Sequence, residues 1–284
     1  MFRGKWPLGL IPCIAASCLI MLAGCAAFRV SETLPRAITG QADVETARQA
    51  LPSYLVLCDA LILADERDIG ALSSGARLYT LYSLLIEPGG ERGQPLSDRA
   101  FGYGSAALCL RSGSMCGYSE MRTGAAGAAL EGLKTGDLPA AGAFVSAWLL
   151  WLQTRSDDPA VLAKLPRVEM LLERMLKLDE SFDNGSSHFY LAILKTLRPP
   201  ALGGDAASAK AHFERALNLT QGKNLSIKVE YAGRYARMLY DRDLHDRLLR
   251  EVLAAPTEAG EFTLFNALAK ARAKKLLETA EEYF

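Results

Sequence analysis

Apolar residues recur in this chain with the 3.6-residue period of an α-helix, and no stretch keeps up the alternation of a β-strand. The period is broken at intervals of about 12 to 20 residues, which is the usual length of a helix in a globular protein. Alanine and leucine are abundant throughout. We therefore expect an all-α fold of stacked antiparallel helix pairs, a compact α-solenoid without a sheet.

Acidic residues mark the expected helix starts. Asp43 precedes "VETARQAL", Asp137 precedes "LPAAGAF", Asp158 precedes Pro159, and Asp205 precedes "AASAKAHF". An aspartate at this place accepts hydrogen bonds from the free N–H groups of the first turn. Proline at the first helical position lacks the donor that would be unpaired there in any case. These residues predict four helices that begin directly after each aspartate.

The C-terminal half repeats itself. "LLERMLKLD" (171–179) aligns with "HFERALNLT" (212–220), and at the same offset of 41 residues "HFYLAILK" (188–195) falls on "VEYAGRYA" (229–236). A weaker third copy, "LLREVLAA", begins at residue 248. Each copy reads as two helices joined by a polar turn. This pattern resembles tetratricopeptide-type repeats, whose usual period is 34 residues.

The segment "LRPPALGGDAASAKAHFERAL", Leu197 to Leu217, is either a phosphate-binding loop or a hinge between packed helices. A phosphate loop needs a preceding strand and usually a GxxxxGK[ST] frame. The preceding "SHFYLAILKTL" reads as helix, and no Lys-Ser or Lys-Thr follows the glycines. We therefore predict a structural hinge, made of Pro199, Pro200, Gly203, Gly204 and Asp205.

Motifs of enzymes are missing from the sequence: it has no HExxH, CxxC or GxSxG frame. His188, His212 and His245 are interpreted as surface or packed histidines rather than metal ligands. The acidic cluster in "YDRDLHDRLL" is typical of an ion-paired helix face. We expect no catalytic residue, no metal and no cofactor.

Six aromatic residues form the candidate lining of a groove or pore. Trp148 and Trp151 are spaced to share one helix face, and the other four occupy matching helices of successive repeats. Equivalent positions of a helical array line one concave surface. Packing in the core is the competing interpretation, and both stay open here. The six are Trp148, Trp151, Phe189, Tyr190, Tyr231 and Tyr235.

The first 24 residues have the pattern of a secretory signal. Arg3 and Lys5 precede an apolar run that ends in small residues, "LIMLAG". An uncleaved membrane anchor is the alternative, but a spanning helix needs about 20 apolar residues, and this run is shorter and contains prolines. We expect residues 1–24 to be removed, 25–42 to form a short linker, and 43–284 to form a single helical domain.

The end of this signal, Leu22-Ala23-Gly24-Cys25, resembles the lipobox of bacterial lipoproteins. The resemblance implies cleavage before Cys25 and acylation of that cysteine. Stable anchoring takes two lipid signals, and a lipoprotein N-terminus supplies two or three acyl chains. Residue 26 is alanine, which in that family favours the outer membrane.

The charge of the chain is balanced, with 32 basic and 32 acidic residues. Removing residues 1–24 takes away two basic residues and no acidic one, which leaves a net charge of −2. A protein without a dominant basic patch is a poor fit to nucleic acid or to an anionic membrane surface.

Cys109 and Cys116 allow two interpretations. In an oxidising compartment they could form a disulfide, with Gly113 and Gly117 bending the chain between them. One continuous helix would instead hold them about 10 Å apart along its axis, which is too far for a disulfide. We expect them, like Cys58, to be buried thiols, with the disulfide as the alternative.

Three segments resemble the T-component lipoproteins of tripartite ATP-independent periplasmic (TRAP) transporters. They are "AWLLWLQTRSDDPAVLAKLPRVEMLLERMLKLDESFDNGSSHFYLA", "RPPALGGDAASAKAHFERALNLTQGKNL" and "YARMLYDRDLHDRLLREVLAAP". The resemblance runs from about residue 43 to residue 256 and is specific in these three places. The earlier "DRAFGYGSAALCLRSG" is similar to a family stretch that is usually richer in arginine and leucine.

This resemblance implies a tetratricopeptide-like lipoprotein of the bacterial envelope that faces the periplasm. It implies a trimer with a hollow through each protomer, and docking to the cognate periplasmic substrate-binding protein. Binding or passage of an apolar or organic-acid ligand is implied as well, and catalysis is not. The alternative hypothesis is a repeat scaffold lipoprotein for envelope assembly or peptidoglycan machinery, and a periplasmic hydrolase ranks third.

Overall fold

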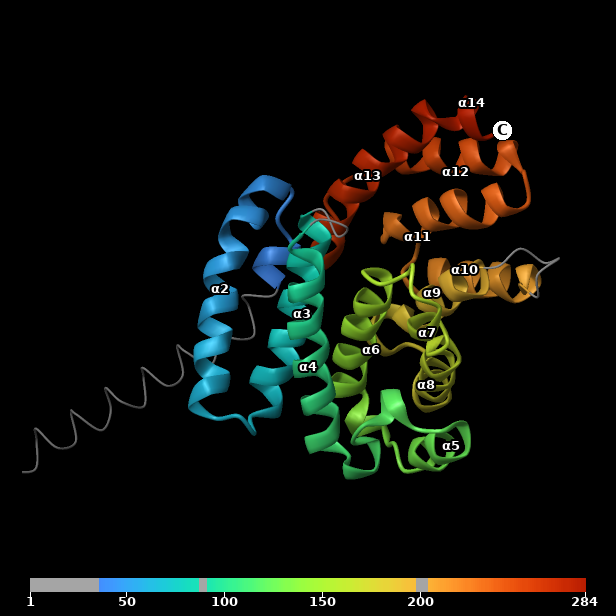
Figure 1. Ribbon diagram of the computed structural model, residues 1–284. Coiled ribbons are helices and arrows are strands. Elements are labelled where there is room, and N and C mark those ends of the chain that lie inside the picture. Colours follow the sequence, from blue (N-terminus) through green and yellow to red (C-terminus); the bar gives the residue numbers. More distant parts are fainter. Residues whose placement is uncertain (1–35, 87–90, 198–203) are drawn as a thin grey trace, which may run out of the picture.

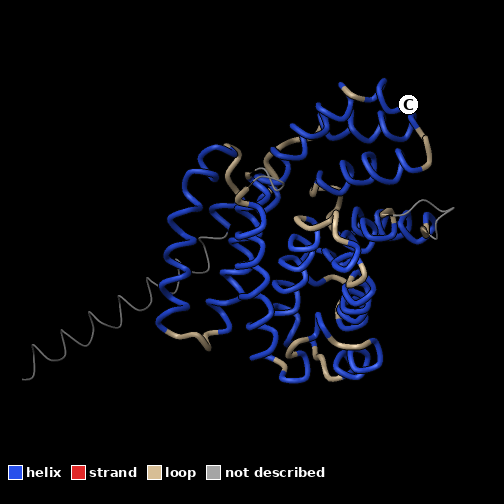
Figure 2. Tube along the Cα trace, viewed as in Figure 1, coloured by secondary structure: helices blue, strands red, loops and turns tan. Residues whose placement is uncertain are grey.

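The computed structural model describes residues 36–86, 91–197 and 204–284, and every regular element in these ranges is helical (Figures 1 and 2). The all-α prediction is therefore confirmed. The α-helices are α2 (Val44–Ala64), α3 (Ile69–Leu85), α4 (Gly93–Arg111), α5 (Thr123–Glu131), α6 (Leu138–Gln153), α7 (Pro159–Leu162), α8 (Leu165–Leu178), α9 (Phe182–Lys195), α10 (Ala206–Leu219), α11 (Leu225–Glu230), α12 (Arg242–Ala254), α13 (Thr263–Glu278) and α14 (Ala280–Tyr283). A π-helical segment, η5 (Tyr231–Ala236), continues α11, and short 3-10 turns connect several helices.

Helices that follow one another along the chain pack as neighbours. In the N-terminal half α2 packs on α3, α3 on α4, and α4 on α6. In the C-terminal half α8 packs on α9 and α9 on α10, and the α11–η5 helix packs on α12 and α13 (Figure 1). The array also closes on itself, because Leu264 at the start of α13 shares a buried cluster with Ile38 and Leu51.

Helix α6 lies at the centre of this arrangement. It carries no charged residue, and between Leu138 and Leu152 only Pro139 is exposed. Its partners are α3, α4 and α8. Phe144 and Trp148 belong to the largest buried cluster, whereas Ala147 contributes to the cluster around α2 and α3. One apolar helix therefore joins two parts of the core.

Glycine explains how closely α4 approaches α6. A Cβ atom at Gly104 would lie 2.9 Å from the Cα atom of Phe144. Such a distance is shorter than real Cβ contacts, so only glycine permits this helix spacing. In the Gly- and Ala-rich stretch "DRAFGYGSAALCLRSG", Gly104 is thus the position of closest approach to α6.

The predicted helix starts are found, and three of the four aspartates cap them. The carboxylates of Asp43, Asp158 and Asp205 each accept a hydrogen bond from a backbone N–H of the first turn. Asp137 precedes α6 but does not cap it. Its carboxylate instead accepts a hydrogen bond from Arg111 Nε at 2.8 Å, which ties the end of α4 to the start of α6.

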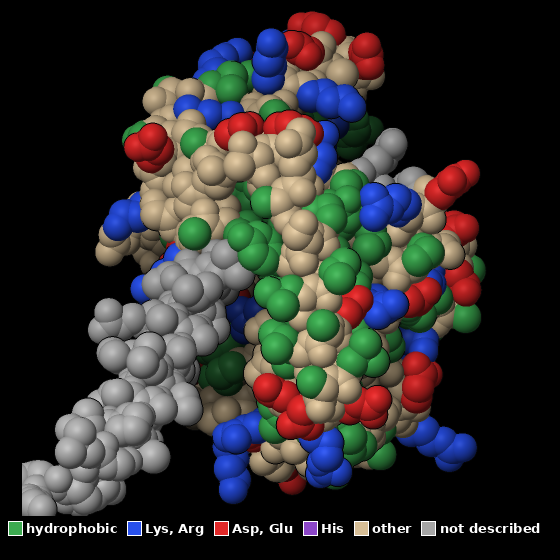
Figure 3. Space-filling view, turned by 90° about the vertical axis from the view of Figure 1, so that its left-hand side faces the viewer, with side chains coloured by type: hydrophobic (Ala, Val, Ile, Leu, Met, Phe, Trp, Pro, Cys, Tyr) green, Lys and Arg blue, Asp and Glu red, His purple; other side chains and the backbone are tan. Residues whose placement is uncertain are grey.

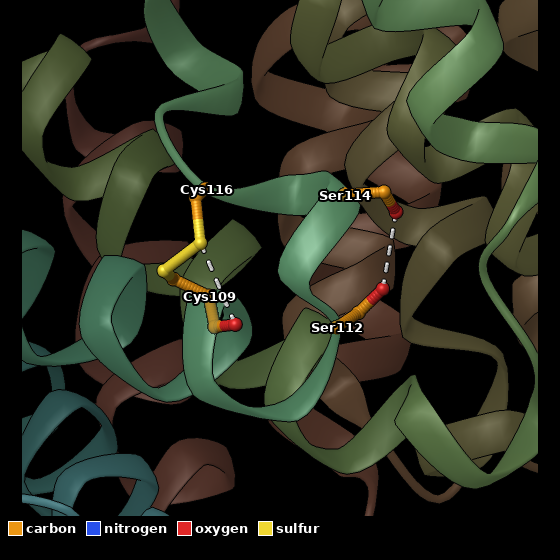
Figure 4. Close-up of a disulfide and its surroundings, with 4 residues drawn as sticks. All are labelled: Cys109, Ser112, Ser114 and Cys116. Carbon is orange, nitrogen blue, oxygen red and sulfur yellow. Dashed lines mark hydrogen bonds between the residues drawn. A yellow bond between two sulfur atoms is a disulfide. The ribbon is translucent and has the colours of Figure 1, made fainter.

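Cys109 and Cys116 form a disulfide (Figure 4). The expectation of two buried thiols is therefore wrong. It assumed one continuous helix, but α4 ends at Arg111 and a 3-10 turn reverses the chain, which brings the two Cα atoms to 4.3 Å. Cys58 is a buried free thiol, as expected, and burial raises its pKa to about 11.

Candidate binding site

Trp148 and Trp151 lie in one aromatic cluster but in different surroundings. Trp148 has no exposed surface, and its ring packs against Phe144 and edge-on against Tyr118. Trp151 is partly exposed and stacks on Phe101 at a centroid distance of 5.3 Å. The first tryptophan thus packs in the core, and the second reaches the surface.

The partly exposed Trp151 is fully engaged by its own chain. Its indole Nε1–H donates a hydrogen bond to Asp98 at 2.8 Å. The guanidinium of Arg155 lies 4.7 Å from the ring centroid, and the ammonium of Lys164 lies 5.6 Å from it. Cations at these distances are attracted to the face of an indole. The environment of Trp151 is that of a structural anchor.

The other four aromatic residues divide between two clusters. Tyr231 stacks on Phe213 at 4.8 Å and meets Tyr235 edge-on at 5.1 Å, and Phe189 packs against the same C-terminal cluster. Tyr190, next to Phe189 in the chain, packs against the cluster around Trp148. The structure therefore does not bring the six residues together on one surface.

Tyr231 and Tyr235 sit on the π-helical segment η5. A single π turn inside a helix is rare and is often found at functional positions. Here Glu230, directly before it, is buried and pairs with Arg234 and Arg272. The irregular turn thus lies beside ion pairs of the buried Glu230, which link it to α13 through the partly exposed Arg272.

Three left-handed turns meet at one cleft, which we call the turn cleft. Asn184 at the start of α9, Gln221 between α10 and α11, and Gly260 before α13 all line it, and their φ angles are 55°, 53° and 61°. Backbone of this kind is costly for residues with a Cβ and tends to cluster at ligand-binding sites. The turn cleft has a volume of about 280 Å³.

The lining of the turn cleft mixes polar residues with the apolar Leu219, Ala259 and Phe262. Its polar lining residues include Asn184, Gln221, Lys223 and Glu261. Asn184 Nδ2 donates a hydrogen bond to Glu261 Oε1 at 3.2 Å, which ties the first turn to the third. The groups present can hold a small polar ligand that carries charge.

A second, more open hollow adjoins the turn cleft. It has a volume of about 500 Å³ and shares Gly260 and Glu261 with it. Arg36 and Glu258 add one charge of each sign. Sequence reasoning missed both hollows, although the turn signal "DNG" at 183–185 was available to mark one wall.

Cys25 and the expected hinge residues between 199 and 205 lie only partly within the described residues. Cys25, Pro199, Pro200 and Gly203 fall outside them. Gly204 is described, and Asp205 caps α10 through a hydrogen bond from the backbone N–H of Ser208 at 2.9 Å. Helix α9, not a strand, precedes this segment. Among the described residues no three His, Cys, Asp or Glu side chains gather in a metal-binding arrangement.

His188 on α9 and His212 on α10 form a pair that the sequence did not indicate. Their Nδ1 atoms lie 2.8 Å apart, so one ring donates a hydrogen bond and the other accepts it. Two protonated rings cannot make this bond. Burial lowers the pKa of both residues. The pair therefore joins the two helices only when at least one ring is neutral.

Charged groups of both helices face this pair. Glu180 lies 3.4 Å from His188 Nε2 and raises the pKa of that ring, but less than burial lowers it. Arg215 of α10, which forms an ion pair with Glu180, lowers the pKa of His188. Lys195 lowers and Asp205 raises the pKa of His212. Together these influences lower the pKa of both rings, so each ring is more readily neutral in the folded protein than in the unfolded chain.

We predict that this pair makes stability depend on pH. The folded pKa of each ring lies below its ordinary value of 6.5, so the unfolded chain binds more protons just below that pH. The free energy of unfolding should fall as the pH drops from about 7.5 to about 5.5. In the double variant His188→Gln, His212→Gln the fall should be smaller. Urea titrations at the two pH values measure it, and an unchanged pH dependence in the variant would contradict the assignment.

Known protein families include one whose model matches most of this chain. No protein of curated function matches it. The family model described as TRAP transporter T-component matches residues 40–284, which is nearly the full length and extends beyond the three segments that carry the resemblance in the sequence. The chain therefore belongs to the TRAP transporter T-component family.

Proposed function

We propose that this protein is a non-enzymatic accessory component of a TRAP-type transport system and that it docks the cognate periplasmic substrate-binding protein. The observation that carries the proposal is the family match over residues 40–284. Membership of this family makes the chain a transport component and suggests a place in the bacterial envelope. A stacked helical array supports a docking role, because such arrays bind partners over extended surfaces.

The turn cleft favours a polar ligand over an apolar one. Trp148 has no exposed surface, and Tyr231 and Tyr235 are buried among other aromatic rings. Charged residues, in contrast, line the two adjoining hollows: the cations Arg36 and Lys223, beside Glu258 and Glu261. A guanidinium or ammonium group is a natural partner of a carboxylate. We propose that a ligand passed from the substrate-binding protein is an organic acid and is held at these cations.

The anchor proposed for this protein is lipid on Cys25, which lies outside the described residues. It is supported by the lipobox-like sequence Leu22-Ala23-Gly24-Cys25. Two or more acyl chains give stable membrane binding, whereas one gives only marginal binding. An outer-membrane position facing the periplasm is part of this proposal.

Changing Cys25 tests the anchor. We predict that Cys25→Ser abolishes the mature, membrane-bound lipoprotein, because no acylated cysteine forms, and that uncleaved or soluble protein appears instead. Cell fractionation and the mass of the N-terminal peptide measure both effects. The variant Cys58→Ser, which changes another free cysteine, should fractionate like the wild type. A Cys25→Ser protein that still appears as mature lipoprotein would refute the anchor.

Copurification tests the transport role. After mild crosslinking of intact cells, we predict that the tagged protein recovers a periplasmic substrate-binding protein of the TRAP type. Recovery should weaken when Lys223→Glu reverses a charge of the turn cleft, and should not change with Lys274→Glu on the exposed side of α13. Consistent recovery of envelope-assembly factors alone would favour the scaffold hypothesis and contradict the proposal.

A further inference from the structure

Tyr240 stands at a turn position where glycine is usually found. The helix that begins as α11 and continues through η5 ends in a Schellman motif. The N–H of Asp241 donates to the carbonyl of Ala236 at 2.9 Å, and the N–H of Tyr240 donates to the carbonyl of Arg237 at 3.1 Å. Tyr240 therefore has a left-handed backbone, with φ 54°. Glycine is common at this position of the motif because a residue with a Cβ is strained there.

Packing within the chain does not explain the ring of Tyr240 either. The residue is 73% exposed, and its one ring–ring contact in the described part of the chain is with Tyr283, at a centroid distance of 5.9 Å. Strained backbone persists where the surrounding structure determines it, and it clusters at functional sites. A tyrosine that is both strained and largely in water indicates a contact with another molecule.

Tyr240 belongs to a small surface that we call the tyrosine patch and define as Arg237, Leu239, Tyr240 and Tyr283. Leu239 and Tyr283 are 42% and 43% exposed. The guanidinium carbon of Arg237 lies 4.6 Å from the centroid of the Tyr283 ring, and the Tyr283 hydroxyl donates to the carbonyl of Arg237 at 3.3 Å. These contacts fix α14 against the turn before α12. Tyrosine and arginine are enriched among the residues that contribute most to protein–protein binding.

We propose that the tyrosine patch is a contact surface for the periplasmic substrate-binding protein. This inference rests on the proposed function and names a place where the docking occurs. An exposed aromatic side chain contributes most to binding when a pocket of the partner encloses it. The partner that fits therefore has an apolar pocket for the ring of Tyr240, with basic residues around that pocket.

The charges around the tyrosine patch favour a basic partner over a second copy of this chain. The exposed charged residues within three positions of its two tyrosines are four acids and one base: Asp241, Asp243, Glu281, Glu282 and Arg242. The base already forms an ion pair with Glu281. Two copies of the patch would bring these acids together, and like charges that face each other across an interface cost binding energy. Lysine or arginine on a different protein would complement them.

The position of the tyrosine patch favours a soluble partner over the bilayer. The segment that carries Cys25 joins the described residues at Arg36, which lines the same hollow as Gly260 at the turn before α13. The sixteen residues of α13 rise by about 24 Å from this hollow toward α14, which carries Tyr283 (Figure 1). An interface of ordinary size, about 800 Å² per partner, is roughly 30 Å across. One partner can therefore cover both the tyrosine patch and the turn cleft.

Photo-crosslinking in intact cells tests this surface on the full-length protein. With p-benzoylphenylalanine at position 240, ultraviolet light should join the chain to the substrate-binding protein, which mass spectrometry of the joined band identifies. Leu63 is the control position, since it is 78% exposed and belongs to α2, whose exposed apolar side chains lie on the side of the molecule that Figure 3 shows. The same amino acid at position 63 should not capture this partner. Equal capture at both positions, or capture at position 240 of only a second copy, only lipid or nothing, would overturn the proposal.

Tyr240→Gly tests the role of the ring separately from the fold. Glycine adopts the left-handed backbone freely, so urea titration should show no loss of stability. The dissociation constant for the substrate-binding protein recovered by copurification should nevertheless rise roughly tenfold or more. Glu282→Lys, which reverses an exposed charge beside the patch, should weaken binding mainly by slowing association. Leu253→Ala, at an exposed position of α12, should change neither quantity.

The outcome for the wild type separates this proposal from the proposed function. If the wild type and Tyr240→Gly bind the substrate-binding protein equally well, the tyrosine patch is not the contact surface, and the transport role stands. If the wild type recovers no substrate-binding protein at all, the proposed function fails, and the contact surface fails with it.

Discussion

A helix without a polar face must be enclosed on every side, and α6 imposes this condition on the rest of the structure. Its sixteen residues, Leu138–Gln153, include no charge, and only Pro139 and Gln153 are exposed, so hydration contributes little to its stability. Helices α3, α4 and α8 surround it. Gly104 lets α4 approach to within van der Waals contact of Phe144, and Asp137 links the start of α6 to Arg111 at the end of α4. Burial of this magnitude is the dominant favourable contribution to folding, so the array is organised around α6.

The features that can serve function lie away from this core. The turn cleft forms where the hairpins end, because left-handed residues such as Asn184 and Gly260 reverse the chain there and leave polar side chains around a hollow. On α2, at the edge of the array, the large apolar residues Val56, Leu57, Leu61 and Leu63 are exposed. A protein built in this way offers surfaces and clefts to partners, which suits an accessory component of a transport system.

The sequence predicted the fold class and most helix starts, because the 3.6-residue period and the aspartate caps are local signals. It did not predict the disulfide, because one continuous helix was expected past Arg111, although Gly113 and Gly117 are local signals of the turn that follows α4. It suggested a shared surface for six aromatic residues because repeats align in sequence, whereas Phe189 and Tyr190, whose rings contact each other, pack against different core clusters. The turn cleft and the His188–His212 pair arise from residues far apart in the chain, so only the tertiary structure shows them.

The most direct test of this account is the free energy of unfolding of Trp148→Ala, measured by urea titration beside Trp148→Phe. If α6 is the enclosed centre of the array, alanine leaves a cavity and costs about 3–5 kcal/mol, while phenylalanine, which keeps a ring in place, costs clearly less. If Trp148→Ala lowered the free energy of unfolding by less than about 1 kcal/mol, the effect would be close to that of a surface substitution. That result would contradict the account. Weakened partner or ligand binding in such a stable variant would show that Trp148 lines a groove instead.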